Sequence, residues 1–225
     1  MSATLPRRLL AACLLAALAA CAGGPPVPDW KMNAQSAIER FQAAYLGGNE
    51  RVEAAEYQRA REQIAATGKI ELVARLELVR CATRAASLVF NECARFERLR
   101  KDAAAPERAY AAYLVGAAKP EEIALLPQAH RGVAGATSDT AAAAAVAGIA
   151  DPLAQLVAAG VLMRTGRASP ALLATAVETA SAQGWRRPLL AWLGVQAMRA
   201  DKAGDAAEAG RIRRRIDLVE GKDPG

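Results

Sequence analysis

The sequence is poor in histidine and in the residues that build β-sheets. Aromatic residues make up 4% of the 225 residues, and His130 is the one histidine. Runs of β-branched residues are scarce, whereas alanine is abundant, and such a composition favours closely packed helices over sheets. We therefore predict an all-α fold.

The chain also lacks the familiar signatures of catalytic and metal sites. A lone histidine cannot form a multi-histidine metal site, and no cluster of cysteines or carboxylates with ligand spacing surrounds His130. We interpret it as a loop or helix-end residue, with a general base as the alternative. The sequence contains neither a glycine-rich phosphate loop nor a Gly-x-Ser-x-Gly elbow. It therefore predicts no metal, no cofactor and no enzymatic activity.

Acidic residues leave one enzymatic alternative open. Glu121 and Glu122 are adjacent, so they point in different directions on a helix, and we expect them to favour its positive N-terminal end. A glycosidase needs two carboxylates across a cleft, and Glu107 and Asp139 are candidates for such a facing pair. A peptidoglycan-acting enzyme or accessory factor is thus the alternative to a non-enzymatic protein.

No apolar run in the sequence has the roughly 20 residues needed to cross a hydrocarbon core. The first one, residues 9–18, follows Arg7 and Arg8 and precedes small residues. A basic start, a short apolar run and small residues before a cut are typical of an export signal. We expect residues 1–20 to be removed as a signal peptide.

The segment Leu18, Ala19, Ala20, Cys21 resembles the lipobox of bacterial lipoproteins. The resemblance implies that the Cys21 thiol takes a diacylglyceryl group, that a dedicated peptidase cuts before it, and that lipid holds the chain to a membrane. Ala22, rather than aspartate, follows the cysteine, which points to the outer membrane with the domain facing the periplasm. An ordinary secretory signal with a chance cysteine is the alternative.

The residues after Cys21 predict a flexible tether. Glycines and prolines dominate residues 21–29, which cannot be helical and suit a short link between lipid and fold. Two of the basic residues behind the net charge of +6 lie in the signal. A basic chain can indicate nucleic-acid binding, but an exported lipoprotein does not normally meet nucleic acid. We expect contact with the membrane through the lipid on Cys21, an envelope protein as partner and no nucleic acid.

A row of arginines marks a possible partner surface near the C-terminus. Arg211, Arg213, Arg214 and Arg215 share one expected helix with Ile212. They could meet acidic headgroups or an acidic protein. The alternative is a solvated face near a helix C-terminus, where positive charge is favourable.

Two cysteines remain after the expected cut, Cys81 and Cys93. On one continuous helix they would lie about 18 Å apart, beyond the reach of a disulfide. An oxidising compartment lets them pair if the chain reverses between them, and Asn91 could cap a new helix that starts just before Cys93. We predict a structural disulfide, with two free buried thiols or a redox-active pair as alternatives.

The N-terminal half has the apolar spacing of amphipathic helices. One helix covers residues 34–45 and ends at Gly47 and Gly48, and Asn49 is placed to cap a second helix over 52–68. These two helices predict a hairpin.

The middle of the chain is less regular. A second helix pair is expected over 72–79 and 93–99. Pro106 and Pro120 suit the first turns of further helices, and we interpret residues 132–139 as a loop.

The C-terminal half predicts two more hairpins. Asp151 with Pro152, and Ser169 with Pro170, each combine a capping side chain with a first-turn proline, and Gly166 fits the end of the first helix. A further hairpin is expected to start near residue 187 and to turn near residue 204. We expect helical hairpins over 30–131 and over 138–220, in two domains or one continuous domain.

The two C-terminal hairpins begin about 35 residues apart, the period of a tetratricopeptide-type repeat. Ala197, Gly204 and Ala209 resemble the small-residue positions of that family, whereas the region around Tyr45 and Gly48 is similar but about one residue out of register. The resemblance implies an array of antiparallel hairpins, or short α-solenoid, whose grooves bind protein or peptide. A generic antiparallel helical array explains the same small residues. The sequence thus predicts a lipid-anchored helical scaffold or adaptor.

Overall fold

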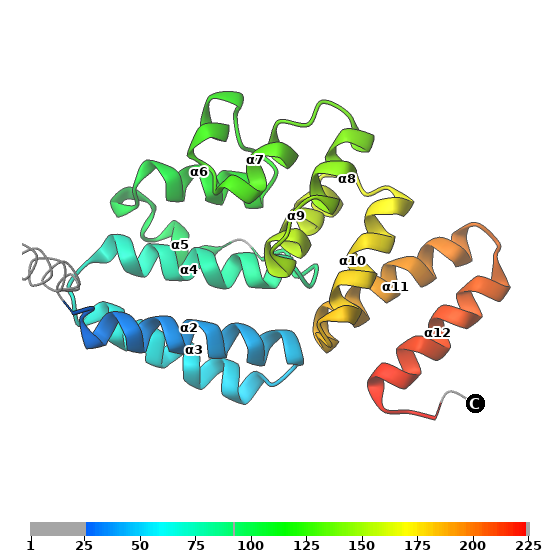
Figure 1. Ribbon diagram of the computed structural model, residues 1–225, viewed down its shortest axis with the longest axis horizontal. Coiled ribbons are helices and arrows are strands. Elements are labelled where there is room, and N and C mark those ends of the chain that lie inside the picture. Colours follow the sequence, from blue (N-terminus) through cyan, green and yellow to red (C-terminus); the bar gives the residue numbers. More distant parts are fainter. Residues whose placement is uncertain (1–25, 92, 224–225) are drawn as a thin grey trace, which may run out of the picture.

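The computed structural model describes residues 26–91 and 93–223, and this part of the chain consists of helices, turns and loops without a strand. Successive helices pack against one another as antiparallel hairpins (Figure 1). The prediction of an all-α fold built from antiparallel hairpins is therefore confirmed. The expected signal peptide, the lipidation site Cys21 and the first residues of the tether lie outside the described residues.

The first hairpin consists of α2 (Asp29–Gly47) and α3 (Glu50–Ala65). Gly48 has a φ of +90°, a left-handed conformation that glycine adopts without a Cβ penalty. The side chain of Asn49 accepts a hydrogen bond from the Val52 amide at 3.2 Å, as a helix cap does. The predicted turn is confirmed, and Val52, the first residue of the second predicted helix, is exposed.

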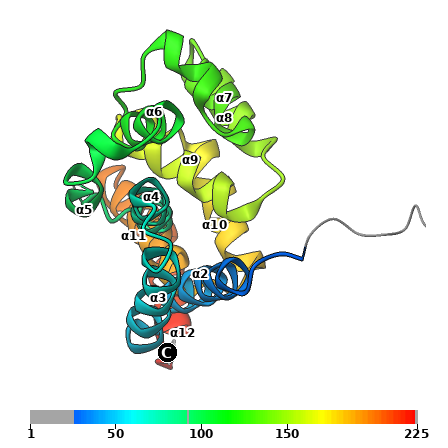
Figure 2. The ribbon, with the colours of Figure 1, turned by 90° about the vertical axis from the view of Figure 1, so that its left-hand side faces the viewer.

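Helix α4 (Ile70–Ala85) connects two apolar cores. In both ribbon views it lies between α6 and the α2–α3 hairpin (Figures 1 and 2). Leu76 on one face joins the core of the first hairpin, whereas Ala74 and Leu78 join the larger core that extends to Ile212. Side chains on opposite faces of one helix thus bind the N-terminal hairpin to the rest of the described chain.

The middle region corrects two expectations. The helix expected over 93–99 is a single turn, α5 (Ala94–Glu97), followed by the 3-10 turn η1 (Arg100–Asp102). Pro106 and Pro120 both lie in the first turns of helices, as expected: Pro106 in α6 (Ala105–Leu114) and Pro120 in the 3-10 helix η2 (Pro120–Leu125).

The second correction concerns the loop expected over 132–139. Helix α7 (Gln128–Ala134) extends into it, and Ser138 caps α8 (Asp139–Ala147), so the connection is shorter. Val133 is buried in the larger core, and this packing outweighs the weak helix propensity of the neighbouring glycine.

The two C-terminal hairpins form where the sequence predicts them. The elements are α9 (Pro152–Arg164), α10 (Pro170–Ala182), α11 (Arg186–Lys202) and α12 (Ala206–Glu220). The side chains of Asp151, Ser169 and Asp205 each accept a hydrogen bond from a first-turn amide of the helix they precede. These short-range interactions explain why the predicted helix starts are confirmed.

Side chains of α11 make polar contacts with the N-terminal helices. The Trp192 side chain is fully buried, and its Nε1 donates to the carbonyl of Ala86 at 3.0 Å. Arg187 donates from Nε to the carbonyl of Tyr45 at 2.9 Å, and its guanidinium lies 4.6 Å from the centre of the Tyr45 ring. Helices far apart in the sequence are therefore held together by specific side chains.

Candidate functional site

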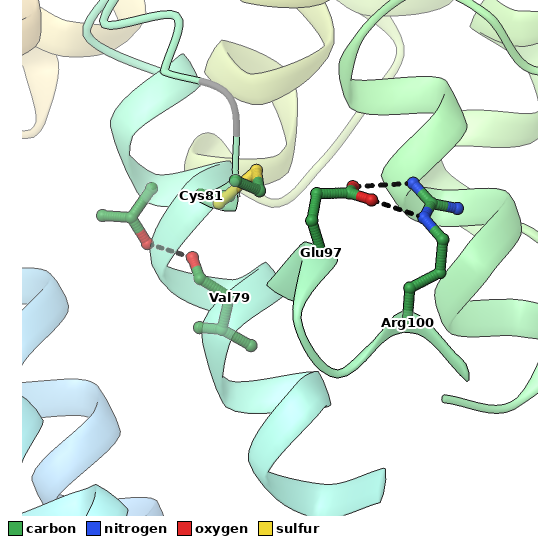
Figure 3. The surroundings of a disulfide bond; sticks show 6 residues. Val79, Cys81, Glu97 and Arg100 are labelled. Carbon is green, nitrogen blue, oxygen red and sulfur yellow. Dashed lines mark hydrogen bonds and ion pairs between the residues drawn. A yellow bond between two sulfur atoms is a disulfide. The ribbon is translucent and has the colours of Figure 1, made fainter. Parts of the chain in front are cut away.

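The predicted disulfide joins α4 to the segment before α5. Cys81 and Cys93 are bonded, with their Cα atoms 5.9 Å apart (Figure 3). The chain reversal that allows this bond lies at Leu88, whose φ of +58° is positive, and the amide of Val89 donates to the carbonyl of Arg84. The pairing prediction is confirmed. The expected cap at Asn91 is wrong, because α5 begins after Cys93 and no side chain caps it.

Beside the disulfide, two buried carboxylates bind basic and phenolic groups. Glu53 is 6% exposed, accepts a hydrogen bond from Arg80 Nε at 3.2 Å and lies 3.7 Å from Arg84 Nη2. Glu77 is 4% exposed and accepts a hydrogen bond from the Tyr57 hydroxyl. Burial, and then this hydrogen bond, raise the pKa of Tyr57. Removal of one partner from such a buried pair leaves an uncompensated buried charge, which is strongly destabilising. The members of this network therefore depend on one another.

Arginines surround this network. Arg80 lies 4.2 Å from the centre of the Tyr57 ring, and Arg95 donates from Nη1 to the Tyr57 hydroxyl at 3.3 Å. Tyr57 and Glu53 both lie in the helix predicted over 52–68, but neither was predicted as a site residue. A signal was available, because Glu53 precedes Tyr57 by four residues and therefore shares its helix face.

His130 lies in the first turn of α7, which agrees with its interpretation as a helix-end residue, but it is buried, with 3% of its surface exposed. Its ring centre lies 5.0 Å from that of Tyr113 and 5.4 Å from that of Tyr110. Burial lowers the pKa of His130 to about 4. A histidine kept neutral among aromatic rings contributes to packing of α7 on α6.

Because of this low pKa, His130 should make stability depend on pH. In the unfolded chain histidine takes up a proton near pH 6.5, whereas folded His130 does so near pH 4. The contribution of His130 to the free energy of unfolding is therefore fully present above about pH 6.5 and is lost as the pH falls toward 4. The shift corresponds to about 3 kcal/mol. We expect chemical denaturation of a His130→Phe variant to show a smaller loss between pH 7 and pH 4 than the native chain shows. Equal losses in the two proteins would contradict the buried neutral histidine.

The structure does not bring Glu107 and Asp139 together as a facing pair. Glu107 in α6 binds Arg75 of α4 at 2.6 Å, and Asp139 binds Arg167 at 2.8 Å. A cavity of about 360 Å³ is lined by Glu107 but not by Asp139. Each carboxylate thus has its own arginine partner on a different element.

The adjacent acidic residues lie at the start of η2. Glu122 accepts a hydrogen bond from the amide of Lys119 at 2.9 Å, in the capping role that adjacent acids at a helix start can take. This arrangement confirms the expected N-terminal position of Glu121 and Glu122.

The four arginines of the expected partner surface lie on α12, and two of them already bind carboxylates of the chain. Arg211 forms two hydrogen bonds with Glu208, and Arg213 donates to Asp201 at 2.6 Å. Arg214 is exposed and Arg215 is half-buried. The positive charge of this face is therefore partly offset by neighbouring acidic groups.

An open groove of about 690 Å³ lies between α9 and α11. Apolar side chains from both helices line it, together with Arg199 and Lys202 of α11. Met198, which lines the groove, is 63% exposed. The groove thus offers apolar contact beside positive charge.

The described residues contain no group of three or more histidine, cysteine, aspartate or glutamate side chains that could hold a metal ion. Within the same ranges, no helix is long and apolar enough to cross a membrane. Comparison of the chain with protein-family models, with curated proteins and with solved structures gives no match.

Proposed function

We propose that this chain is a lipid-anchored, periplasm-facing helical scaffold or adaptor that binds another envelope protein or peptide. The observation that carries the proposal is the open groove between α9 and α11. The lipobox-like segment ending at Cys21 supports the anchor and the compartment. The repeat spacing of the two C-terminal hairpins supports a tetratricopeptide-like array, a type of fold that binds partners in its grooves.

The chemistry of the groove indicates which partner it suits. Met163 of α9 and Met198 of α11 line it together with Val195. Methionine side chains are flexible and polarizable, so they adapt to different apolar side chains of a partner. Arg199, held by a hydrogen bond to the carbonyl of Ala168 at 2.9 Å, and Lys202 add positive charge. An apolar segment with flanking acidic residues matches this surface.

The proposal predicts that one exposed methionine is needed for partner binding. A Met198→Lys variant places another positive charge in the groove and removes apolar contact, so we expect a partner recovered by the native chain from detergent-solubilised envelopes to be lost. Met32→Lys is the matched control, because Met32 is also exposed, at 50%, but lies on α2 outside the groove. Quantitative mass spectrometry of the recovered proteins measures the difference.

Two outcomes of this experiment count against the proposal. Recovery of the same partner by the Met198→Lys variant would exclude the groove as its binding site. Recovery of no reproducible partner by the native chain would contradict the scaffold function itself. A Cys21→Ala variant tests the anchor separately, since we expect it to leave the membrane fraction.

A further inference from the structure

Apolar side chains are exposed at the end of the fold where the tether joins it. Val27, which precedes α2, is 51% exposed, and Ile70, the first residue of α4, is 47% exposed. Trp30, in the first turn of α2, is half-buried and lines a cavity together with Leu72 of α4, so the two helix starts lie close together. Figure 1 shows both helix starts at the left-hand end, and Figure 2 turns that end toward the viewer. We call Val27, Trp30 and Ile70 the anchor-side face.

The length of the tether keeps this face close to the membrane. This step rests on the proposed lipid anchor at Cys21. Val27 follows Cys21 by six residues, and a fully extended chain of that length spans at most about 20 Å. The start of α2 therefore lies within about 20 Å of the lipid-bearing sulfur. A flexible tether limits this distance but does not decide which side of the domain meets the bilayer.

The chemistry of the anchor-side face suits a membrane interface. Tryptophan is enriched where hydrocarbon meets headgroups, because its ring is apolar and its N–H is polar. Lys31 and Lys69 are exposed beside the face, and lysine stems can cross an apolar layer while the ammonium group reaches headgroup phosphates. Asp29 and Glu71 are also exposed there, and residues 22–25 add no charged side chain. The local charges thus balance, so apolar contact rather than net charge favours the bilayer.

We propose that the anchor-side face lies in the headgroup layer of the bilayer that holds the lipid on Cys21. Exposed apolar side chains that enter this layer are removed from water, which is favourable. Val27 and Trp30 belong to the start of the first hairpin, whereas Ile70 belongs to α4. Contact through two separate segments fixes the orientation of the domain, which a flexible tether alone leaves open.

This orientation determines where the groove between α9 and α11 is held. Helices α11 and α12 lie at the opposite end of the molecule from the starts of α2 and α4 (Figure 1). With the anchor-side face on the bilayer, the groove is held away from the membrane surface. It then meets partners from the aqueous periplasm rather than segments buried in the bilayer.

Spin labels on the lipidated chain, reconstituted into vesicles of phosphatidylethanolamine and phosphatidylglycerol, test the contact. An Ile70→Cys variant carries one label, and a Val52→Cys variant carries the reference label, because Val52 is exposed and lies about 20 Å along α3 from the end that precedes Ile70. Cys81 and Cys93 are bonded to each other, so the new thiol alone reacts. Oxygen concentrates in hydrocarbon, whereas a nickel chelate stays in water. We expect the ratio of oxygen to nickel accessibility to be severalfold higher at position 70 than at position 52, and equal ratios would overturn the proposal.

A charge placed on the face tests whether apolar contact is responsible. Val27→Glu, combined with the label at position 70, puts a carboxylate in the headgroup layer outside any helix, so the ratio should fall toward that of the reference label. Val115→Glu is the matched control, because Val115 is exposed at the end of α6 and is not part of the face, and it should leave the ratio unchanged.

Two other outcomes separate this inference from the anchor. A ratio that Val27→Glu does not change would mean that the tether alone brings position 70 near the bilayer, and it would overturn the proposal while leaving the anchor intact. A chain that does not float with the vesicles would contradict the lipid anchor, and this inference with it.

Discussion

An alanine at position 160 should lower the free energy of unfolding by about 2–3 kcal/mol, the cost of forcing extra atoms into a packed interior. Gly160 lies in α9 where that helix crosses the end of α4. A Cβ atom added there would lie 2.3 Å from the carbonyl oxygen and 3.0 Å from the carbonyl carbon of Ala85. Both atoms belong to the backbone, so the two helices would have to move apart. Urea denaturation of the Gly160→Ala variant measures the loss.

The control is a glycine with open space around it. Gly194 lies in α11, and a Cβ atom added there meets no atom within 4 Å. Alanine is favoured over glycine in a helix by up to about 1 kcal/mol, so Gly194→Ala should stabilise the protein or leave it unchanged. Opposite signs for the two variants are expected. A Gly160→Ala variant as stable as the Gly194→Ala variant would contradict the close approach of α9 and α4.

Removing the Cys81–Cys93 disulfide should cost about 3 kcal/mol, because the bond closes a short loop in the unfolded chain. A Cys81→Ser, Cys93→Ser double variant should therefore unfold at a lower urea concentration than the oxidised native chain.

A reducing agent provides the control for the disulfide. It should destabilise the native chain by a similar amount and leave the double variant unchanged. Equal stability of the native chain with and without the reducing agent would contradict a stabilising bond.

Helix ends that depend on neighbouring residues could be predicted from the sequence. Asn49, Asp151 and Ser169 cap the helices that follow them through contacts within three residues. Such contacts are visible in the sequence because the donor and the acceptor are close along the chain.

Features that depend on distant contacts could not be predicted. His130 and Val133 are buried because α7 packs on other helices, and no local pattern indicates this. Leu88 has a positive φ, which its residue type does not suggest. The pairing of Cys81 with Cys93 was predicted, but the position of the chain reversal at Leu88 was not.

The hydrogen bond from Arg187 to the carbonyl of Tyr45 joins residues that are 142 positions apart in the sequence. In a simple linear repeat protein, each unit touches only its neighbours, so the ends can fray while the middle stays folded. Here Arg187 of α11, in the last hairpin, contacts the first hairpin directly, and Trp192 of the same helix donates a hydrogen bond to the carbonyl of Ala86 at the end of α4. Loss of either terminal hairpin would therefore expose surface on the other end, and the chain should gain or lose its structure as one unit.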